Sequence, residues 1–173
     1  MTQKAFISLG SNIDPETNLP LAVHLLNAIG DVIAISMVYQ NPAVGPTPQP
    51  PFLNAAVLVE TNHPPQTIRN LLRAIEGDLG RVRGEDKYAP RTIDLDLCLL
   101  GNIVMENQDI TLPDPDLLER AHLAVPLAEL NPDFLHPVSG ERLSQIAARL
   151  RAGADLLPRA DVAERMESSW ASG

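Results

Sequence analysis

The chain has 173 residues, the size of one ordinary domain, and its 45% hydrophobic and 20% charged residues exclude wholesale disorder. Its formal net charge of −9 argues against a general nucleic-acid-binding protein, and its single cysteine, Cys98, excludes an internal disulfide and a cysteine-based zinc cluster. The first residues, MTQKAFISLGSN, lack a basic start followed by an apolar stretch, and no run approaches about 20 apolar residues. We therefore expect a cytoplasmic protein with neither a secretion signal nor a membrane span.

The first half of the chain alternates between strand and helix patterns. Over residues 4–9, polar and apolar side chains alternate weakly, and the turn residues Gly-Ser-Asn follow, which is typical of a strand. Residues 16–29 have apolar residues at helical spacing and stop at a glycine, which predicts a helix. Residues 31–40 and 52–61 are rich in β-formers and predict two further strands. The segment between them, 41–51, holds five prolines, so it forms neither a strand ladder nor a helix.

The second half of the chain continues this alternation and then becomes helical. The predicted elements are a helix over 65–79, a long loop over 80–92, a strand over 93–100, a short strand over 102–105, and helices near 116–130 and 140–152. We expect the short strand to pair back on its predecessor through the glycine between them. Residues 154–173 are small, polar and acidic, and are expected to form a loosely ordered C-terminal extension to one domain over 1–153.

The order of these elements indicates the fold class. Strand, helix, strand, strand, helix, strand suits an α+β sandwich of the ferredoxin-like kind. In that arrangement the sheet is antiparallel and the helices pack on one of its faces. The chain shows no internal repeat and no linker, which supports a single domain.

Two aspartates lie on one face of the predicted strand over 93–100. Side chains alternate along a strand, so Asp94, Asp96 and Cys98 are expected to point one way. The other way point Ile93, Leu95, Leu97 and Leu99. The Cα atoms of the aspartates would lie roughly 6–7 Å apart. Such a pair needs compensating positive charge, and it suits Mg²⁺, which completes its shell with water and phosphate oxygens. A half-exposed strand with polar residues facing water gives the same short pattern, so this alternative stays open.

Basic residues gather just before the aspartates. Six of the 13 lysines and arginines lie in the helix and loop preceding Asp94, among them Arg81, Arg83, Lys87 and Arg91. Carboxylates that hold metal ions beside several guanidinium groups are typical of phosphoryl transfer. The chain has neither a Walker-type phosphate loop nor a glycine-rich dinucleotide fingerprint, so a phosphate site would be built from side chains and metal ions. Alternatively, these basic residues belong to a solvent-exposed helix face followed by a basic turn, with no phosphate site.

An aromatic residue and an amide follow the proline-rich loop. Aromatic residues make up only 3% of the chain, and Phe52 begins a predicted strand with Asn54 on the same face. A planar apolar ring beside an amide that both donates and accepts suits a flat heterocycle. A core anchor next to an ordinary polar strand residue would give the same pattern.

Together these segments resemble the hydroxymethyldihydropterin pyrophosphokinase family. The matching blocks are Leu9-Gly-Ser-Asn12, Gly45-Pro46, Phe52-Leu-Asn-Ala-Ala56, Gly80-Arg-Val-Arg83, Pro90-Arg-Thr-Ile-Asp-Leu-Asp96, Glu119-Arg-Ala121 and Val125-Pro-Leu-Ala-Glu-Leu130. They follow the family's order and span roughly residues 5 to 137. The resemblance implies a monomeric enzyme of folate biosynthesis that transfers pyrophosphate from ATP to 6-hydroxymethyl-7,8-dihydropterin and releases AMP.

The resemblance also implies roles for individual residues. Asp94 and Asp96 would hold two Mg²⁺ ions, while Arg81 and Arg91 would contact phosphate and assist transfer. The implied ATP-binding positions are Glu76, Arg83, Lys87, Leu97, Thr111 and Arg120. The implied pterin-binding positions are Asn41, Pro42, Val44, Phe52, Asn54, Asp94 and His122. The two long loops would close over the substrates and exclude water.

The chain departs from the family pattern at four positions. Asp114 stands where the family usually has histidine, and His122 where it commonly has phenylalanine. Lys87 and Tyr88 occupy loop positions usually held by arginine and tryptophan. Two alternatives to the active enzyme therefore remain: a pterin- or nucleotide-binding module without turnover, and a pyrophosphokinase acting on a modified pterin alcohol. The intact aspartate pair with its arginines favours the active enzyme.

Overall fold

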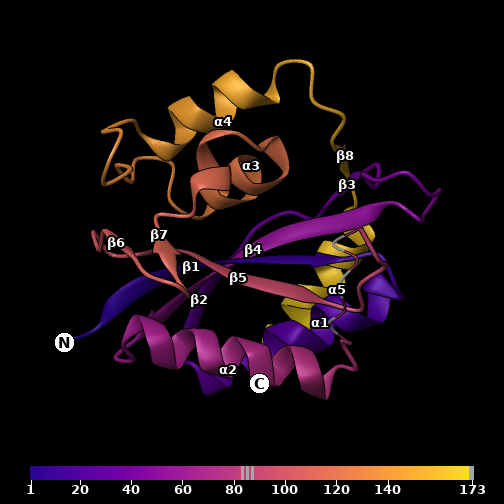
Figure 1. Ribbon diagram of the computed structural model, residues 1–173, viewed down its shortest axis with the longest axis horizontal. Helices are drawn as coiled ribbons and strands as arrows, with labels where there is room; N and C mark the ends of the chain where they lie inside the picture. Colours follow the sequence, from indigo (N-terminus) through magenta and orange to yellow (C-terminus); the bar gives the residue numbers. More distant parts are fainter. Residues whose placement is uncertain (83, 85, 87, 172–173) are drawn as a thin grey trace.

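The computed structural model describes residues 1–171 except 83, 85 and 87. A six-stranded sheet occupies its centre in the order β5, β1, β4, β3, β8, with β2 also paired to β4 (Figure 1). The strands are β1 (Gln3–Ser11), β2 (Asp31–Ile35), β3 (Tyr39–Asn41), β4 (Phe52–Thr61), β5 (Asp94–Leu100) and β8 (Leu157–Pro158). The pairings between these described strands are antiparallel, as predicted. A small second sheet pairs β6 (Met105–Glu106) with β7 (Thr111–Leu112).

Helices cover both faces of the central sheet (Figure 1). One face carries α1 (Pro15–Leu25), the 3₁₀ turn η1 (Leu26–Ala28), α2 (Pro65–Asp78) and α5 (Ala160–Ala171). The other face carries the 3₁₀ turn η2 (Pro115–Leu118), α3 (Ala121–Leu130) and α4 (Leu143–Arg151). The α+β class is confirmed, whereas the expectation of helices on one face was wrong. Helices α3 and α4 form a second layer because each has an apolar face that must be buried in the core on this side of the sheet.

Successive residues of β1 point into two separate cores. Ile7 and Leu9 pack with α1, α2 and α5, while Phe6 packs with α3 and α4. All three side chains are almost wholly buried. A strand covered on both faces needs apolar residues on both, and this explains why the alternation in the sequence of this strand is weak.

An irregularity in β5 redirects its last side chains. Ile7 pairs with Leu97 but Phe6 pairs with Leu99, so Cys98 is an extra residue on the β5 side of the ladder. Leu97 packs against the core beside α1 and α2, as predicted, whereas both Cys98 and Leu99 lie in the core beneath α3 and α4. The predicted direction of Leu99 was wrong because strict alternation holds only as far as the bulge.

Three predicted elements differ in detail from those observed. The strand expected over 31–40 is interrupted at Ser36, whose backbone N–H donates to the Ala56 carbonyl and whose hydroxyl accepts from the Ala56 N–H. The strand expected over 102–105 pairs with β7 rather than with β5. The helix expected over 116–130 divides into η2 and α3, because Arg120, the residue just before α3, has an extended backbone.

The C-terminal extension contains a short strand and a helix, β8 and α5. β8 pairs with β3, and α5 lies beside α1 (Figure 1). Val162, Ala163 and Met166 are buried in the core that α1 and α2 share. The sequence analysis did not predict this helix, because its apolar residues recur on one face among small and polar neighbours that mask the pattern.

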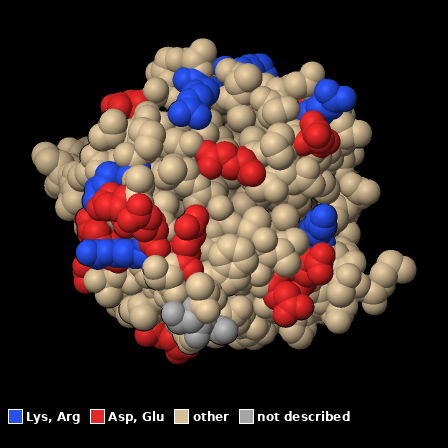
Figure 2. Space-filling view, turned by 180° about the vertical axis from the view of Figure 1, so that it is seen from behind, with Lys and Arg blue, Asp and Glu red and all other residues tan. Residues whose placement is uncertain are grey.

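Charged side chains on the side opposite that of Figure 1 form small groups, some of mixed sign and some of one sign, separated by uncharged surface (Figure 2). Ion pairs between described surface residues include Arg149–Glu141 and Arg159–Asp161. Among the described residues, no helix combines the length and the apolar character that crossing a membrane requires.

Candidate active site

The two aspartates lie on β5, at one edge of the central sheet. Asp94 pairs with Gly10 and Asp96 with Ser8 of the neighbouring β1, so the two carboxylates share one face of the strand, as predicted. Their side chains are 24% and 43% exposed. Helix α2 runs alongside this edge and brings basic residues to it.

Asp94 is held between two arginines. Its Oδ1 accepts a hydrogen bond from Arg81 Nη1 at 2.8 Å, and its Oδ2 accepts one from Arg91 Nη1 at 3.0 Å. Arg81 Nη1 also donates to the Ile93 carbonyl at 3.0 Å, and the Arg81 side chain is only 9% exposed. The structure therefore brings together three of the four predicted catalytic residues through direct contacts. Their charge-assisted bonds fix the direction in which the Asp94 carboxylate points.

Glu76 lies beneath this group rather than in an open cavity. Its side chain is 2% exposed, and its carboxylate accepts from Arg73 Nη1 at 2.9 Å and from Arg81 Nη1 at 3.3 Å. The backbone N–H of Leu95 donates to the same carboxylate at 2.8 Å. A buried carboxylate is tolerated only when it is paired and hydrogen-bonded, and these contacts meet that condition. Glu76 thus links α2 to β5 and orients Arg81.

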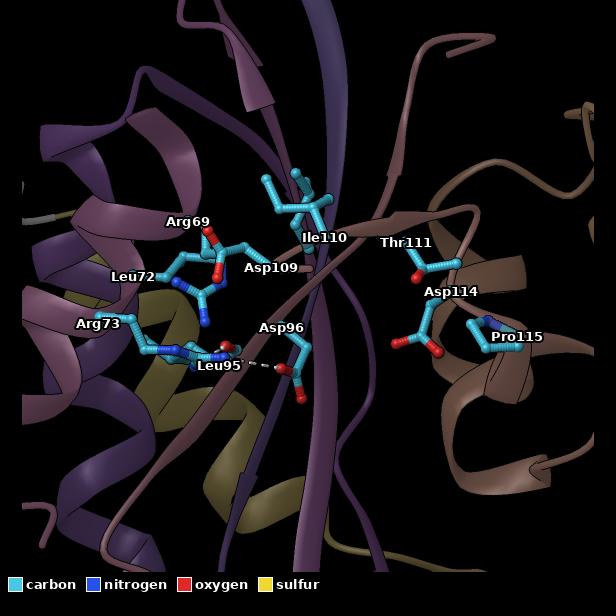
Figure 3. Close-up of a pocket in the computed structure, with 11 residues that line it drawn as sticks. Arg69, Leu72, Arg73, Leu95, Asp96, Asp109, Ile110, Thr111, Asp114 and Pro115 are labelled. Atoms are coloured by element: carbon cyan, nitrogen blue, oxygen red, sulfur yellow. Dashed lines mark hydrogen bonds and ion pairs between the residues drawn. The ribbon is translucent and has the colours of Figure 1, made fainter. Parts of the chain in front are cut away.

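A recess of about 200 Å³, which we call the edge recess, opens beside Asp96. It is lined by Arg69, Leu72, Arg73, Leu95, Asp96, Leu97, Asp109, Ile110, Thr111, Asp114 and Pro115. Figure 3 shows Arg69 and Arg73 of α2 on one side, Asp114 on the other and Asp96 between them. Arg73 Nη2 lies 3.9 Å from Asp96 Oδ1. Of the predicted ATP-binding positions, Leu97 and Thr111 line this recess.

The edge recess has an excess of negative charge near Asp96. Partial desolvation, and next the charge of Asp94, raise the pKa of Asp96 to about 7, against the opposing effect of Arg73. Burial also raises the pKa of Asp114, whose carboxylate accepts from the Asp116 N–H at 2.9 Å. The described residues contain no cluster of three or more metal-ligating side chains. The arrangement suits a cation that takes two carboxylates from the protein and further oxygens from a ligand.

A second recess of about 410 Å³, which we call the loop recess, lies under the proline-rich segment. It is lined by Asn41, Pro42, Val44, Phe52, Asn54, Tyr88, Ala89, Arg91, Asp116, Arg120 and His122. Every predicted pterin-binding position except Asp94 lines it, although these residues come from β3, β4, α3 and the segment after β3. Arg120, predicted to contact ATP, also lies here, so both Arg91 and Arg120 bring positive charge to this recess.

Two polar side chains of the loop recess have defined surroundings. Asn54 Nδ2 donates a hydrogen bond to Asn41 Oδ1, which leaves the Asn54 carbonyl oxygen facing Gly10. A side-chain carbon at Gly10 would come within 2.9 Å of that oxygen, so a larger residue there would displace the Asn54 amide from this position. Burial, followed by the nearby charge of Arg120, lowers the pKa of His122 below its ordinary value of 6.5. His122 therefore presents a neutral imidazole at neutral pH.

The two long loops meet beside the loop recess. Gln49 Nε2 donates to the Tyr88 carbonyl, and Asn12 Nδ2 donates to Gln49 Oε1 at 2.9 Å. Asn12 Oδ1 in turn accepts from the Arg91 N–H at 2.7 Å. Asn12 thus ties the proline-rich segment to the segment that positions Arg91. Two predicted ATP-binding residues, Arg83 and Lys87, lie outside the described residues.

The sequence prediction of the site missed several residues. Arg69, Arg73 and Asp109 line the edge recess but were not assigned to it. The spacing of Arg69 and Arg73, four residues apart on a predicted helix, was a usable signal, because such residues share a helix face. Asn12 belonged to a recognised block, but its link to residue 49 depends on the fold and has no sequence signature.

The sequence matches known proteins over most of its length. The model of the 7,8-dihydro-6-hydroxymethylpterin-pyrophosphokinase (HPPK) family matches residues 6–132. A 2-amino-4-hydroxy-6-hydroxymethyldihydropteridine pyrophosphokinase of Synechocystis sp. is 38% identical over 145 residues, which cover 82% of this chain and 73% of the relative. The protein of the same name from Bacillus subtilis is 41% identical over 133 residues, covering 75% and 79%.

Solved structures show a similar fold. A Plasmodium falciparum HPPK-DHPS structure matches with a TM-score of 0.69 at 13% identity, covering 86% of this chain. This chain spans 45% of the length of that protein, so the likeness concerns one part of it. The predicted family is confirmed: the chain belongs to the 7,8-dihydro-6-hydroxymethylpterin-pyrophosphokinase family and is a pyrophosphokinase of folate biosynthesis.

Proposed function

We propose that this chain transfers the pyrophosphoryl group of ATP to 6-hydroxymethyl-7,8-dihydropterin with the help of Mg²⁺, across two adjoining recesses. ATP would lie in the edge recess and the pterin in the loop recess. The observation that carries this proposal is the Arg81–Asp94–Arg91 group, because it joins the two. Asp94 neighbours Asp96 of the edge recess, and it is bonded to Arg91 of the loop recess.

The loop recess has the chemistry that a pterin requires. A pterin is flat and carries hydrogen-bond donors and acceptors on its edge. Phe52 and a neutral His122 supply planar faces, and Asn54 supplies an amide that both donates and accepts. Because Asn54 is 9% exposed, a ligand that pairs with it is largely shielded from water. This proposal assigns recognition of the ring to these three residues.

The carboxylates fit the metal ions that the family resemblance implies. Asp94 and Asp96 lie on one strand face, and the raised pKa of Asp96 shows that added positive charge would stabilise its ionised form. We propose that these two carboxylates hold the Mg²⁺ ions. When bound, Mg²⁺ would neutralise phosphate charge and make the pterin alcohol a better nucleophile.

The remaining work falls to the chain's own basic residues. Arg81, buried and oriented by Glu76, holds Asp94 in place and keeps positive charge beside the reacting phosphates. Arg91 is 28% exposed and lines the loop recess, so it can reach a phosphate that enters between the substrates. Arg69 and Arg73 offer further charge to the phosphates or ribose of a nucleotide in the edge recess. The contact between the two loops would help to exclude water from the transfer.

The test is to measure AMP formation from ATP and 6-hydroxymethyl-7,8-dihydropterin, with and without Mg²⁺. We expect AMP release that depends on both the pterin and Mg²⁺, and that is lost in an Asp94→Ala/Asp96→Ala double variant. Binding of ATP and the pterin without AMP formation by the wild-type chain would contradict the proposal and favour a binding module. Turnover of a modified pterin alcohol in preference to this one would contradict the substrate assignment alone.

A further inference from the structure

The C-terminal segment 157–171 lies outside the range that the family model matches, yet it contacts elements that form the candidate site. Its first part, β8, pairs with β3, and its second part, α5, packs along α1 (Figure 1). Val162 and Met166 of α5 are fully buried in the core. The segment is therefore anchored at one end by a helix and attached at the other to the sheet.

Strand β3 depends on this segment for the pairing of one of its two edges. β3 has three residues, and β4 covers only one of its edges. On the other edge Tyr39 pairs with Pro158 and Gln40 with Leu157, and the Arg159 N–H donates to the Val38 carbonyl at 2.8 Å. Without β8, a strand of this length would have an unpaired outer edge and little to hold it.

One side chain joins β3 to both α1 and α5. Arg159 Nη1 donates to Gln40 Oε1 at 3.0 Å, and its Nη2 lies 3.4 Å from Glu16 Oε1 of α1. The same guanidinium group also contacts the Asp161 carboxylate at 3.0 Å. The planar guanidinium suits this fork of contacts, because its donors point in fixed directions that a lysine cannot reproduce.

The position of β3 matters because the wall of the loop recess begins at its end. Asn41, the last residue of β3, lines the loop recess and accepts a hydrogen bond from Asn54. Pro42 and Val44 follow and complete the same wall. Prolines lack backbone donors, so this segment gains few ladder bonds of its own, and β3 fixes the end of it that carries Pro42 and Val44. Any movement of β3 would therefore be passed directly to the pterin-binding wall.

We propose that β8 and α5 form a positioning element for the pterin site, and that Arg159 is its central residue. This inference rests on the proposed location of the pterin in the loop recess. Arg159 does not line that recess; it acts through Gln40 and the pairing of β3. It sets the relative position of Asn41 and Asn54, which determines how well the amide pair meets the edge of the heterocycle.

The test compares steady-state kinetics and thermal unfolding of the full chain with those of Arg159→Ala and Arg159→Lys. We expect Arg159→Ala to raise the pterin KM about tenfold, the size of one lost charge-assisted hydrogen bond, and to leave the ATP KM within about twofold. The pterin KM of Arg159→Lys should fall between those of the wild type and Arg159→Ala. Arg165→Ala is the matched control, because Arg165 lies on α5 close to Arg159, donates a hydrogen bond to the Glu16 carbonyl at 3.5 Å rather than to β3, and should leave both KM values unchanged.

Gln40→Ala and Phe52→Ala complete the experiment. Gln40→Ala removes the acceptor alone, so it should raise the pterin KM even if Arg159→Ala does not fold. Phe52→Ala tests the loop recess itself: an unchanged pterin KM in this variant would overturn the proposed pterin location. A raised pterin KM in Phe52→Ala, together with an unchanged one in Gln40→Ala or a folded Arg159→Ala, would overturn the positioning role alone. Equal increases in the pterin and ATP KM values would overturn it as well.

Discussion

Asp94 and Asn54 stand one strand apart, on either side of Gly10. Asp94 of β5 and Asn54 of β4 both pair with this glycine of β1. Directly paired residues in a sheet present their side chains on the same face, so the carboxylate and the amide face the same region across a residue that has no side chain. The proposed phosphate and pterin halves of the site are thus spaced by the sheet itself.

Gly10→Ala should weaken pterin recognition. The added Cβ would come within 2.9 Å of Asn54 Oδ1, so the amide must move away from its present position. We expect a pterin KM increased by about tenfold, with a smaller effect on the ATP KM, in steady-state AMP formation. Gly77→Ala is the control, since a Cβ there meets nothing within 4 Å and the residue is helical. That variant should leave both KM values unchanged and raise the unfolding free energy by about 0.5–1 kcal/mol.

Asp96→Asn should separate activity from stability. The substitution removes a proposed metal ligand, so we expect kcat to fall by about 100-fold or more. It also removes a charge that partial desolvation and Asp94 both disfavour, so without Mg²⁺ the variant should unfold at the same or a higher temperature than the wild type. Full activity in this variant would contradict the proposed role. A large fall in its Tm would contradict the electrostatic argument.

Glu76→Ala should destabilise the fold far more than the loss of a surface carboxylate. It removes one of the two carboxylate partners of the buried Arg81 and leaves the Leu95 N–H without its acceptor, and we expect a cost of about 3–5 kcal/mol in denaturant unfolding. Glu141→Ala breaks the more exposed pair with Arg149 and should cost less than about 1 kcal/mol. Similar costs for the two variants would show that Glu76 is not the link between α2 and β5 that its contacts indicate.

His122 should give pterin binding a dependence on acid pH. Burial and Arg120 lower its pKa, so the ring is neutral at neutral pH and becomes charged only as pH falls below the ordinary value of 6.5. The charged ring stacks less favourably and lies near Arg120, so the pterin KM should rise as pH falls through the lowered pKa. His122→Phe should remove this rise. The measurement is the pterin KM of the wild type and of His122→Phe, compared from neutral pH down to below the pKa of His122. The same rise in both proteins would assign it to another group.

The fold was largely predictable because its signals are local. The helix over 65–79 and the strands over 52–61 and 93–100 agree with α2, β4 and β5 to within a residue or so, since each has an uninterrupted apolar period bounded by glycine, proline or a loop. The bulge at Cys98 and the break at Ser36 were not predictable, because each depends on register against a partner strand. Helix α5 was missed because small residues weaken its apolar period.

The candidate site was predictable only in part. The resemblance grouped residues of β3, β4, α3 and the segment after β3 as pterin-binding positions, and the structure brings these residues together in the loop recess, which spacing alone does not predict. The resemblance placed Arg120 with ATP, whereas the structure places it in the loop recess. The resemblance also did not distinguish Arg81, which is buried on Glu76, from the more exposed Arg91. Burial depends on which helix covers the strand, and no short motif records that.

Residues in and beside the edge recess also form hydrogen bonds with the outer edge of β5, which no described strand of the central sheet covers. The contacts are Arg81 to the Ile93 carbonyl, Arg73 to the Leu95 carbonyl, the Leu95 N–H to Glu76, and the Asp114 N–H to the Cys98 carbonyl. An unsealed strand edge is a template on which a second chain can add. We therefore expect side chains of the proposed site to protect this edge from pairing with another chain as well. Variants at Arg73 or Glu76 should lose solubility along with activity, and size-exclusion chromatography would reveal the two losses together.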